Sequence, residues 1–168
     1  MGLLSWLGLQ RGDAYPNLDA LMKELRRAMP DDESVLIRYM AIVVVLLGKV
    51  AWADGGFSEK EESSLRALLA HVDRIAPSGV EAVCAVLRGT PPKMSDEENE
   101  LCFRELKSLC DARERMEVLR LLIRLATADG ALSDSEHAEL KVIAEELGVP
   151  EAELLSVEKE IVEAPPEA

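Results

Sequence analysis

Apolar residues recur at helical spacing along most of this chain. Leucine, valine, isoleucine and methionine recur every three or four positions. The segments between these apolar runs contain proline, glycine and helix-capping residues such as serine. The predicted helices cover approximately residues 18–29, 31–53, 59–75, 77–89, 95–110, 111–128, 133–147 and 151–162. No segment shows the sustained alternation of a strand. The pattern therefore predicts an all-α, single-domain bundle of seven to eight helices.

Two of these helices are predicted to lie at the centre of the bundle. The helix over residues 31–53 is apolar nearly all round, which is typical of a buried helix, and the helix over residues 111–128 is its counterpart. The longest uninterrupted apolar stretch, residues 40–47, is well short of the roughly 20 residues that a membrane span requires. We therefore expect core helices here.

A nine-residue pattern follows each central helix. Residues 53–61 read ADGGFSEKE, and residues 128–136, which lie 75 positions later, read ADGALSDSE. When residues 46–69 are aligned with residues 121–144, nine of 24 positions are identical. The repeat predicts an internal pseudo-twofold duplication of helix–Asp-Gly loop–helix units.

Each copy has a structural explanation that involves no ligand. Its glycine suits the left-handed backbone that ends a helix, and its Ser-x-x-Glu forms a capping box at the start of the next helix. These residues are Gly55, Ser58 and Glu61 in the first copy and Gly130, Ser133 and Glu136 in the second.

The alternative explanation is cation binding. Asp-Gly-x-apolar-Ser-x-x-Glu matches the second half of an EF-hand loop, but apolar residues and a threonine occupy most of the ligand positions of the first half. Calcium takes six to eight oxygens, so neither copy is a complete EF-hand. A calcium or magnesium site pooled across the pseudo-twofold remains open, and its predicted ligands are Asp54, Glu61, Asp129 and Glu136. Glu62 and His137, which are equivalent in the two copies, are further candidates.

The composition of the chain limits which partners it can bind and which reactions it can catalyse. A net charge of −13 argues against nucleic acid, since phosphate binding needs a surface of lysine and arginine. The three cysteines form no CxxC pair and are expected to be buried, reduced thiols. The chain contains no Walker, GxSxG or HExxH motif, and we expect it not to be an enzyme. His71 is expected to contact the last carbonyls of its helix rather than a metal.

The two ends of the chain are predicted to lie outside the helical domain of residues 17–162. Residues 1–16 form an apolar segment without the basic start or cleavage site of a secretory signal. We expect this segment to be flexible or to dock, either on its own domain, on a protein partner or peripherally on a membrane. Residues 163–168 are expected to be a disordered tail, and residues 90–92 a linker between the halves.

The doubled Ala-Asp-Gly-x-(Phe/Leu)-Ser-x-x-Glu, each copy following an aliphatic helix, resembles the tellurite resistance protein B (TerB) family. It is also similar to the N-terminal region of membrane-anchored DjlA-type co-chaperones, although the chain has no His-Pro-Asp signature of a J-domain. The resemblance implies a bacterial cytoplasmic protein, near the inner membrane in some members, that acts in tellurite and stress response. It also implies divalent-metal binding at Asp54, Glu61, Asp129 and Glu136.

Two functions follow as expectations. The first is a non-catalytic binding module of the TerB type that responds to a divalent cation and acts through protein partners. The second is a metal-independent protein–protein adaptor.

Overall fold

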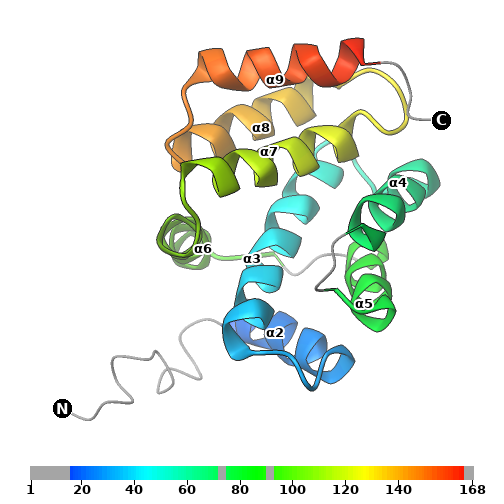
Figure 1. Cartoon of the computed structure of the whole chain (residues 1–168), viewed down its shortest axis with the longest axis vertical. Helices are drawn as coiled ribbons and strands as arrows, with labels where there is room; N and C mark the ends of the chain where they lie inside the picture. Colours follow the sequence, from blue (N-terminus) through cyan, green and yellow to red (C-terminus); the bar gives the residue numbers. More distant parts are fainter. Residues whose placement is uncertain (1–15, 72–74, 90–92, 165–168) are drawn as a thin grey trace.

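The computed structural model describes residues 16–71, 75–89 and 93–164, and every regular element in these ranges is a helix (Figure 1). The all-α, single-domain prediction is therefore confirmed. The helices are α2 (Pro16–Ala28), α3 (Ser34–Ala51), α4 (Glu59–Ala70), α5 (Pro77–Arg88), α6 (Asp96–Leu109), α7 (Ala112–Ala126), α8 (Asp134–Glu146) and α9 (Glu151–Glu163).

Helix α3 runs through the middle of the molecule (Figure 1). It packs against α2, α5, α6, α7 and α8, and residues 40–48 are buried without interruption. Among the described residues it is the one helix long and apolar enough to cross a membrane by length and composition alone, but 67% of it is buried inside the domain. That burial is expected of a core helix whose apolar side chains face neighbours on all sides.

The helices that follow the two Asp-Gly loops pack on the opposite halves. Helix α4 packs on α7, the central helix of the second half, and α8 packs on α3, the central helix of the first. Helices α7, α8 and α9 also contact one another and form the layer at the top of Figure 1. Because each of these helices packs on the central helix of the other half, both Asp-Gly loops lie near the contact between α3 and α7. A twofold relation over the whole domain stays a prediction.

A single carboxylate joins the starts of α2 and α6. Glu98, which is fully buried, accepts hydrogen bonds from the Asn17 and Leu18 amides at 2.9 and 3.1 Å and from the Asn17 side chain at 2.9 Å. It also accepts one from the Ser95 amide at 2.8 Å. The first amides of a helix have no partner within the helix, so one carboxylate here satisfies two helix starts.

Two predicted helix boundaries differ from the structure by three residues or more. Helix α4 ends at Ala70 rather than near residue 75, and His71 is its cap, with its amide donating to the carbonyls of Leu68 and Leu69. Helix α3 begins after Glu33 rather than at residue 31 or 32. The Asp32 carbonyl instead accepts a hydrogen bond from Arg26 of α2, which holds this turn outside the helix.

Several sequence predictions fall on residues that the structure does not describe. The apolar N-terminal segment, apart from Pro16, lies outside the described residues, as do the predicted linker at residues 90–92 and the last four residues of the tail. The predicted start of the tail is wrong by two residues, because Glu163 is the last residue of α9 and Ala164 is its cap.

Candidate functional site

The two Asp-Gly loops have similar backbone conformations where each central helix ends and at the following glycine. Trp52 and Thr127 end the central helices with nearly equal angles, φ −98° and ψ 3° against φ −92° and ψ 2°. Three residues later Gly55 and Gly130 have φ of +113° and +142°, where side-chain-bearing residues are strained. Each glycine amide donates to the carbonyl of the helix-ending residue, at 3.3 Å and 3.2 Å. Sequence similarity in the pattern therefore corresponds to similar local structure at the helix end and at the glycine.

Both predicted capping boxes of the repeat are formed. The Ser58 amide donates to Glu61 Oε2 at 2.7 Å, and the Ser133 amide donates to Glu136 Oε2 at 2.8 Å. In return each serine Oγ accepts the amide of its glutamate. The two glutamates are 4% and 3% exposed, so these are buried carboxylates held at the start of a helix.

The same box occurs at α6 and α7, which shows that the motif alone does not identify a binding site. Glu98 in the α6 box receives its additional hydrogen bonds from α2, and Glu114 in the α7 box is exposed to solvent. Glu136 also accepts a hydrogen bond from the Ser133 hydroxyl at 2.7 Å. Glu61 differs from the other three, because its Oε1 is buried without a hydrogen-bond partner among the described residues.

The surroundings of Glu61 disfavour its negative charge. Burial raises the pKa of this carboxyl, hydrogen bonds from Ser58 oppose the rise, and the carboxylates of Asp129 and Asp54 add to it. Asp129 lies in the second loop, and it acts on Glu61 because α4 packs against α7. The structure therefore brings two of the other predicted ligands, Asp54 and Asp129, within electrostatic range of Glu61.

The described residues contain no group of three or more histidine, cysteine, aspartate or glutamate side chains placed to hold a metal ion as they stand. Asp54 and Asp129 are exposed to solvent, whereas Glu61 and Glu136 are fixed by their capping boxes. The arrangement is a buried carboxylate whose charge is disfavoured, Glu61, and two exposed carboxylates, Asp54 and Asp129, that make no hydrogen bond with the described residues. Glu136 occupies the equivalent position at the start of α8.

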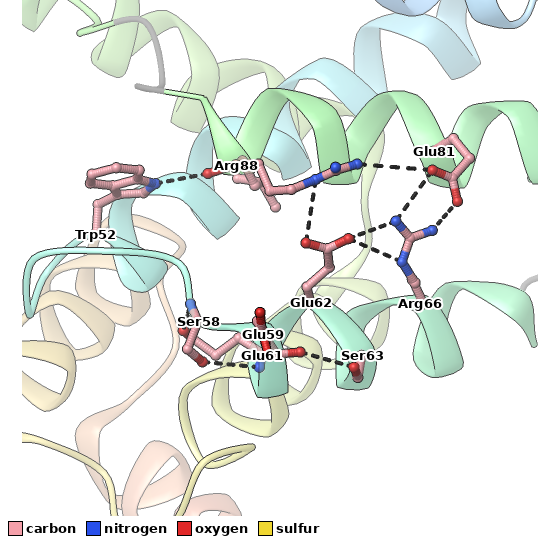
Figure 2. Close-up of polar contacts among 10 residues, drawn as sticks. Trp52, Ser58, Glu59, Glu61, Glu62, Ser63, Arg66, Glu81 and Arg88 are labelled. Carbon is pink, nitrogen blue, oxygen red and sulfur yellow. Dashed lines mark hydrogen bonds and ion pairs between the residues drawn. The ribbon is translucent and has the colours of Figure 1, made fainter.

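The additional candidates Glu62 and His137 are engaged elsewhere. Glu62 is paired with Arg66 at 2.6 Å and with Arg88 at 3.3 Å, and Glu81 pairs with both arginines. Figure 2 shows this chain of charges bridging α4 and α5, with Glu62 directed toward α5 while Glu61 stays beside Ser58.

On the second half, His137 Nδ1 lies 3.0 Å from Glu158 of α9. Neither Glu62 nor His137 therefore joins the predicted ligands, because each already has a partner of complementary chemistry on a neighbouring helix.

Two predictions about side chains outside the loops are confirmed. All three cysteines are free and buried, and burial raises the pKa of the Cys102 thiol to about 12, which makes it a poor nucleophile. His71 Nδ1 lies 2.7 Å from the Ala67 carbonyl at the end of α4, as expected for a histidine that caps its own helix.

Sequence reasoning did not separate Glu61 from Glu136. The two residues have the same local motif, and their difference arises from tertiary packing of α4 against the second half. It also did not anticipate that the Trp52 indole donates to the Leu87 carbonyl at 3.1 Å, which ties the first loop to the end of α5 (Figure 2). No local pattern in the sequence predicts the difference between Glu61 and Glu136 or the Trp52–Leu87 hydrogen bond.

Comparison with known proteins identifies one family. A family model described as tellurite resistance protein TerB matches residues 40–159, a range that includes both Asp-Gly loops and α4 to α8 in full. Comparisons with curated proteins and with solved structures give no significant match.

Proposed function

The chain belongs to the TerB family, and we propose that it is a non-catalytic module of tellurite and stress response that binds a divalent cation between its two Asp-Gly loops. The proposed ligands are Asp54, Glu61 and Asp129, with Glu136 contributing from the second capping box. Calcium and magnesium are the expected ions, because carboxylate oxygens are the hard donors that these ions take.

The observation that supports this proposal is the unpartnered Oε1 of Glu61. A buried acceptor without a hydrogen bond is costly, and a buried negative charge next to two others is costlier still. A cation would supply the missing contact and neutralise the repulsion from Asp54 and Asp129. Binding requires these exposed aspartates to turn toward Glu61, since no complete ligand group is preformed in the described part of the chain.

Isothermal titration calorimetry with calcium and with magnesium tests the proposal. We expect a saturable heat for the wild type that disappears in the Asp54→Asn/Asp129→Asn double variant. The matched control is Asp31→Asn/Asp96→Asn, which removes the same two charges at exposed positions away from the loops. Equal heats for both double variants would show that the cation responds only to net charge and would refute the site.

The competing function is a metal-independent adaptor for protein partners. The observation that favours it is that Glu61 and Glu136 already satisfy the cap amides of α4 and α8. An adaptor predicts silent titrations with both ions and equal thermal stability with and without them. A cation-binding module predicts a rise in melting temperature with ion concentration, because a ligand that binds only the folded state stabilises it.

A further inference from the structure

An apolar groove of about 390 Å³ opens beside the first half of α3, a size within the range of binding pockets. Leu36 and Val35 of α3 line it together with Leu109 at the end of α6 and Leu121 of α7. Val35 is 59% exposed and Leu109 is 39% exposed. Two large apolar side chains exposed in one groove indicate a surface that something covers.

The edge of this groove is acidic. Glu33 and Glu114 both line it and both are exposed to solvent. Glu33 stands at the start of α3 without making a capping hydrogen bond, so its carboxylate is not used to satisfy that helix. The groove therefore favours an occupant that combines several apolar side chains with a positive charge.

The chain contains a segment of that chemistry. Residues 1–11, which lie outside the described residues, carry Leu3, Leu4, Trp6, Leu7 and Leu9. Arg11 is the only charged side chain among them, within a protein of net charge −13, and the next charged side chain along the chain is Asp13. No other stretch of the chain outside the described helices has comparable apolar content.

The segment is joined to the domain at a distance that it can span. Residue 16 opens α2 at Glu98, near the start of α6, while Leu109 in the groove lies at the end of the same helix. A helix of 14 residues is about 21 Å long. Residues 10–15 extend to about 20 Å, which is enough to carry the apolar residues along α6 to the groove.

A second groove, of about 430 Å³, carries less suitable charges. It lies between α2, α3, α5 and α6, and Lys49 and Lys93 line it with Asp96. Lys49 is paired with Glu139 at 3.4 Å, so this lining has no excess of acidic side chains to attract Arg11, whereas the glutamates of the first groove do attract it.

We propose that residues 1–9 bind in this groove, which α3, α4, α5, α7 and the end of α6 line, in the same molecule, with Arg11 held near Glu33 and Glu114. The leucine and tryptophan side chains cover Val35 and Leu109. The N-terminal segment is then an intramolecular cover of this surface, independent of the cation site proposed above.

Tryptophan fluorescence tests this docking in the full chain. The emission of Trp6 is the difference between the wild type and a Trp6→Phe variant, so Trp52 and its hydrogen bond stay untouched. We expect the Trp6 emission to be shifted to shorter wavelength and shielded from acrylamide, relative to a free peptide of residues 1–15. Val35→Gln and Leu109→Gln, each measured with and without Trp6→Phe, should lose that shielding.

Val142→Gln is the matched control, because Val142 is a 50% exposed valine on α8 away from the groove. It should leave Trp6 shielded. Trp6 exposed in the wild type, or shielded equally in all variants, would overturn the proposal. Shielding that is lost on dilution would place the segment on a second copy. Shielding that arises only with vesicles of equal phosphatidylglycerol and phosphatidylcholine would place it on a membrane, and either result would also overturn intramolecular docking.

Discussion

Glu98→Ala is the substitution that we expect to destabilise this fold most through a polar contact. The wild-type carboxylate accepts hydrogen bonds from the amides of Ser95, Asn17 and Leu18, and thereby caps α6 and α2 together. Alanine leaves both helix starts without this acceptor. It also leaves the Leu18 amide buried and unpaired.

The expected cost follows from these contacts. Loss of the cap contact at α6 costs about 1 kcal/mol. At α2 the buried Leu18 amide is left without an acceptor, which costs about 1–3 kcal/mol. The total is about 2–4 kcal/mol, a large part of the roughly 5–15 kcal/mol by which a domain is usually stable.

Urea denaturation followed by far-ultraviolet circular dichroism measures this cost. Glu114→Ala is the matched control, because Glu114 occupies the same position of a capping box but is exposed and accepts the single Asp111 amide. It should cost about 0.5–1 kcal/mol. Equal losses for the two variants would refute the argument that Glu98 joins two helices.

The Glu98 carboxylate should also make the free energy of unfolding depend on pH. Burial alone would raise the pKa of Glu98, but hydrogen bonds from the Asn17 side chain and from the amides of Ser95, Leu18 and Asn17 bring it below the usual value of 4.5. The ionised form is thus stabilised by folding, so its contribution is present above pH 4.5 and is lost as pH falls through the folded pKa. Between these two pH values the wild type should lose more stability than Glu98→Ala, and parallel curves would contradict the lowered pKa.

Four further results are expected. Leu119→Ala, at a fully buried position of α7, should lower the free energy of unfolding by about 2–5 kcal/mol in urea denaturation, and a loss under 1 kcal/mol would mean that the core is loosely packed there. Gly55→Ala should cost more than about 1 kcal/mol because φ is +113°, whereas Gly56→Ala, which has open space and no positive φ, should be nearly neutral in the same assay. For Glu61 the raised pKa means that its stabilising contribution is complete below pH 4.5 and is lost as pH rises through the folded pKa. Glu61→Gln should therefore gain stability relative to the wild type as pH rises in cation-free buffer. A constant difference in the free energy of unfolding between the two proteins would contradict this. Cys102, with a pKa of about 12, should resist iodoacetamide at neutral pH in the folded protein and react after unfolding, and rapid labelling of the native chain would contradict its burial.

Local signals in the sequence were sufficient to predict the helices, apart from the end of α4 and the start of α3, and the turns of the two Asp-Gly loops. A capping box and a left-handed glycine involve residues within three or four positions of each other, so Ser58–Glu61 and Gly55 were predictable from spacing alone. The all-round apolar pattern of residues 31–53 likewise predicted a central helix, because only a fully surrounded helix avoids exposing such a surface.

Contacts between distant residues were not predictable in this way. Asn17 and Glu98 are 81 positions apart, and the first helix start gives no sign of where its acceptor lies. The unpartnered oxygen of Glu61 and its exposure to the charge of Asp129 depend on how α4 meets the second half. The groove beside α3 is formed by four or more segments, none of which is unusual by itself.

A nuclear magnetic resonance titration of the isotope-labelled full chain with calcium and with magnesium tests the cation site most directly. The site proposed at Asp54, Glu61 and Asp129 predicts that the backbone amides of Gly55 and Gly130 shift together, with one common affinity. Shifts confined to one loop, or scattered over acidic helix starts such as the first turn of α6, would contradict a shared site between the two halves.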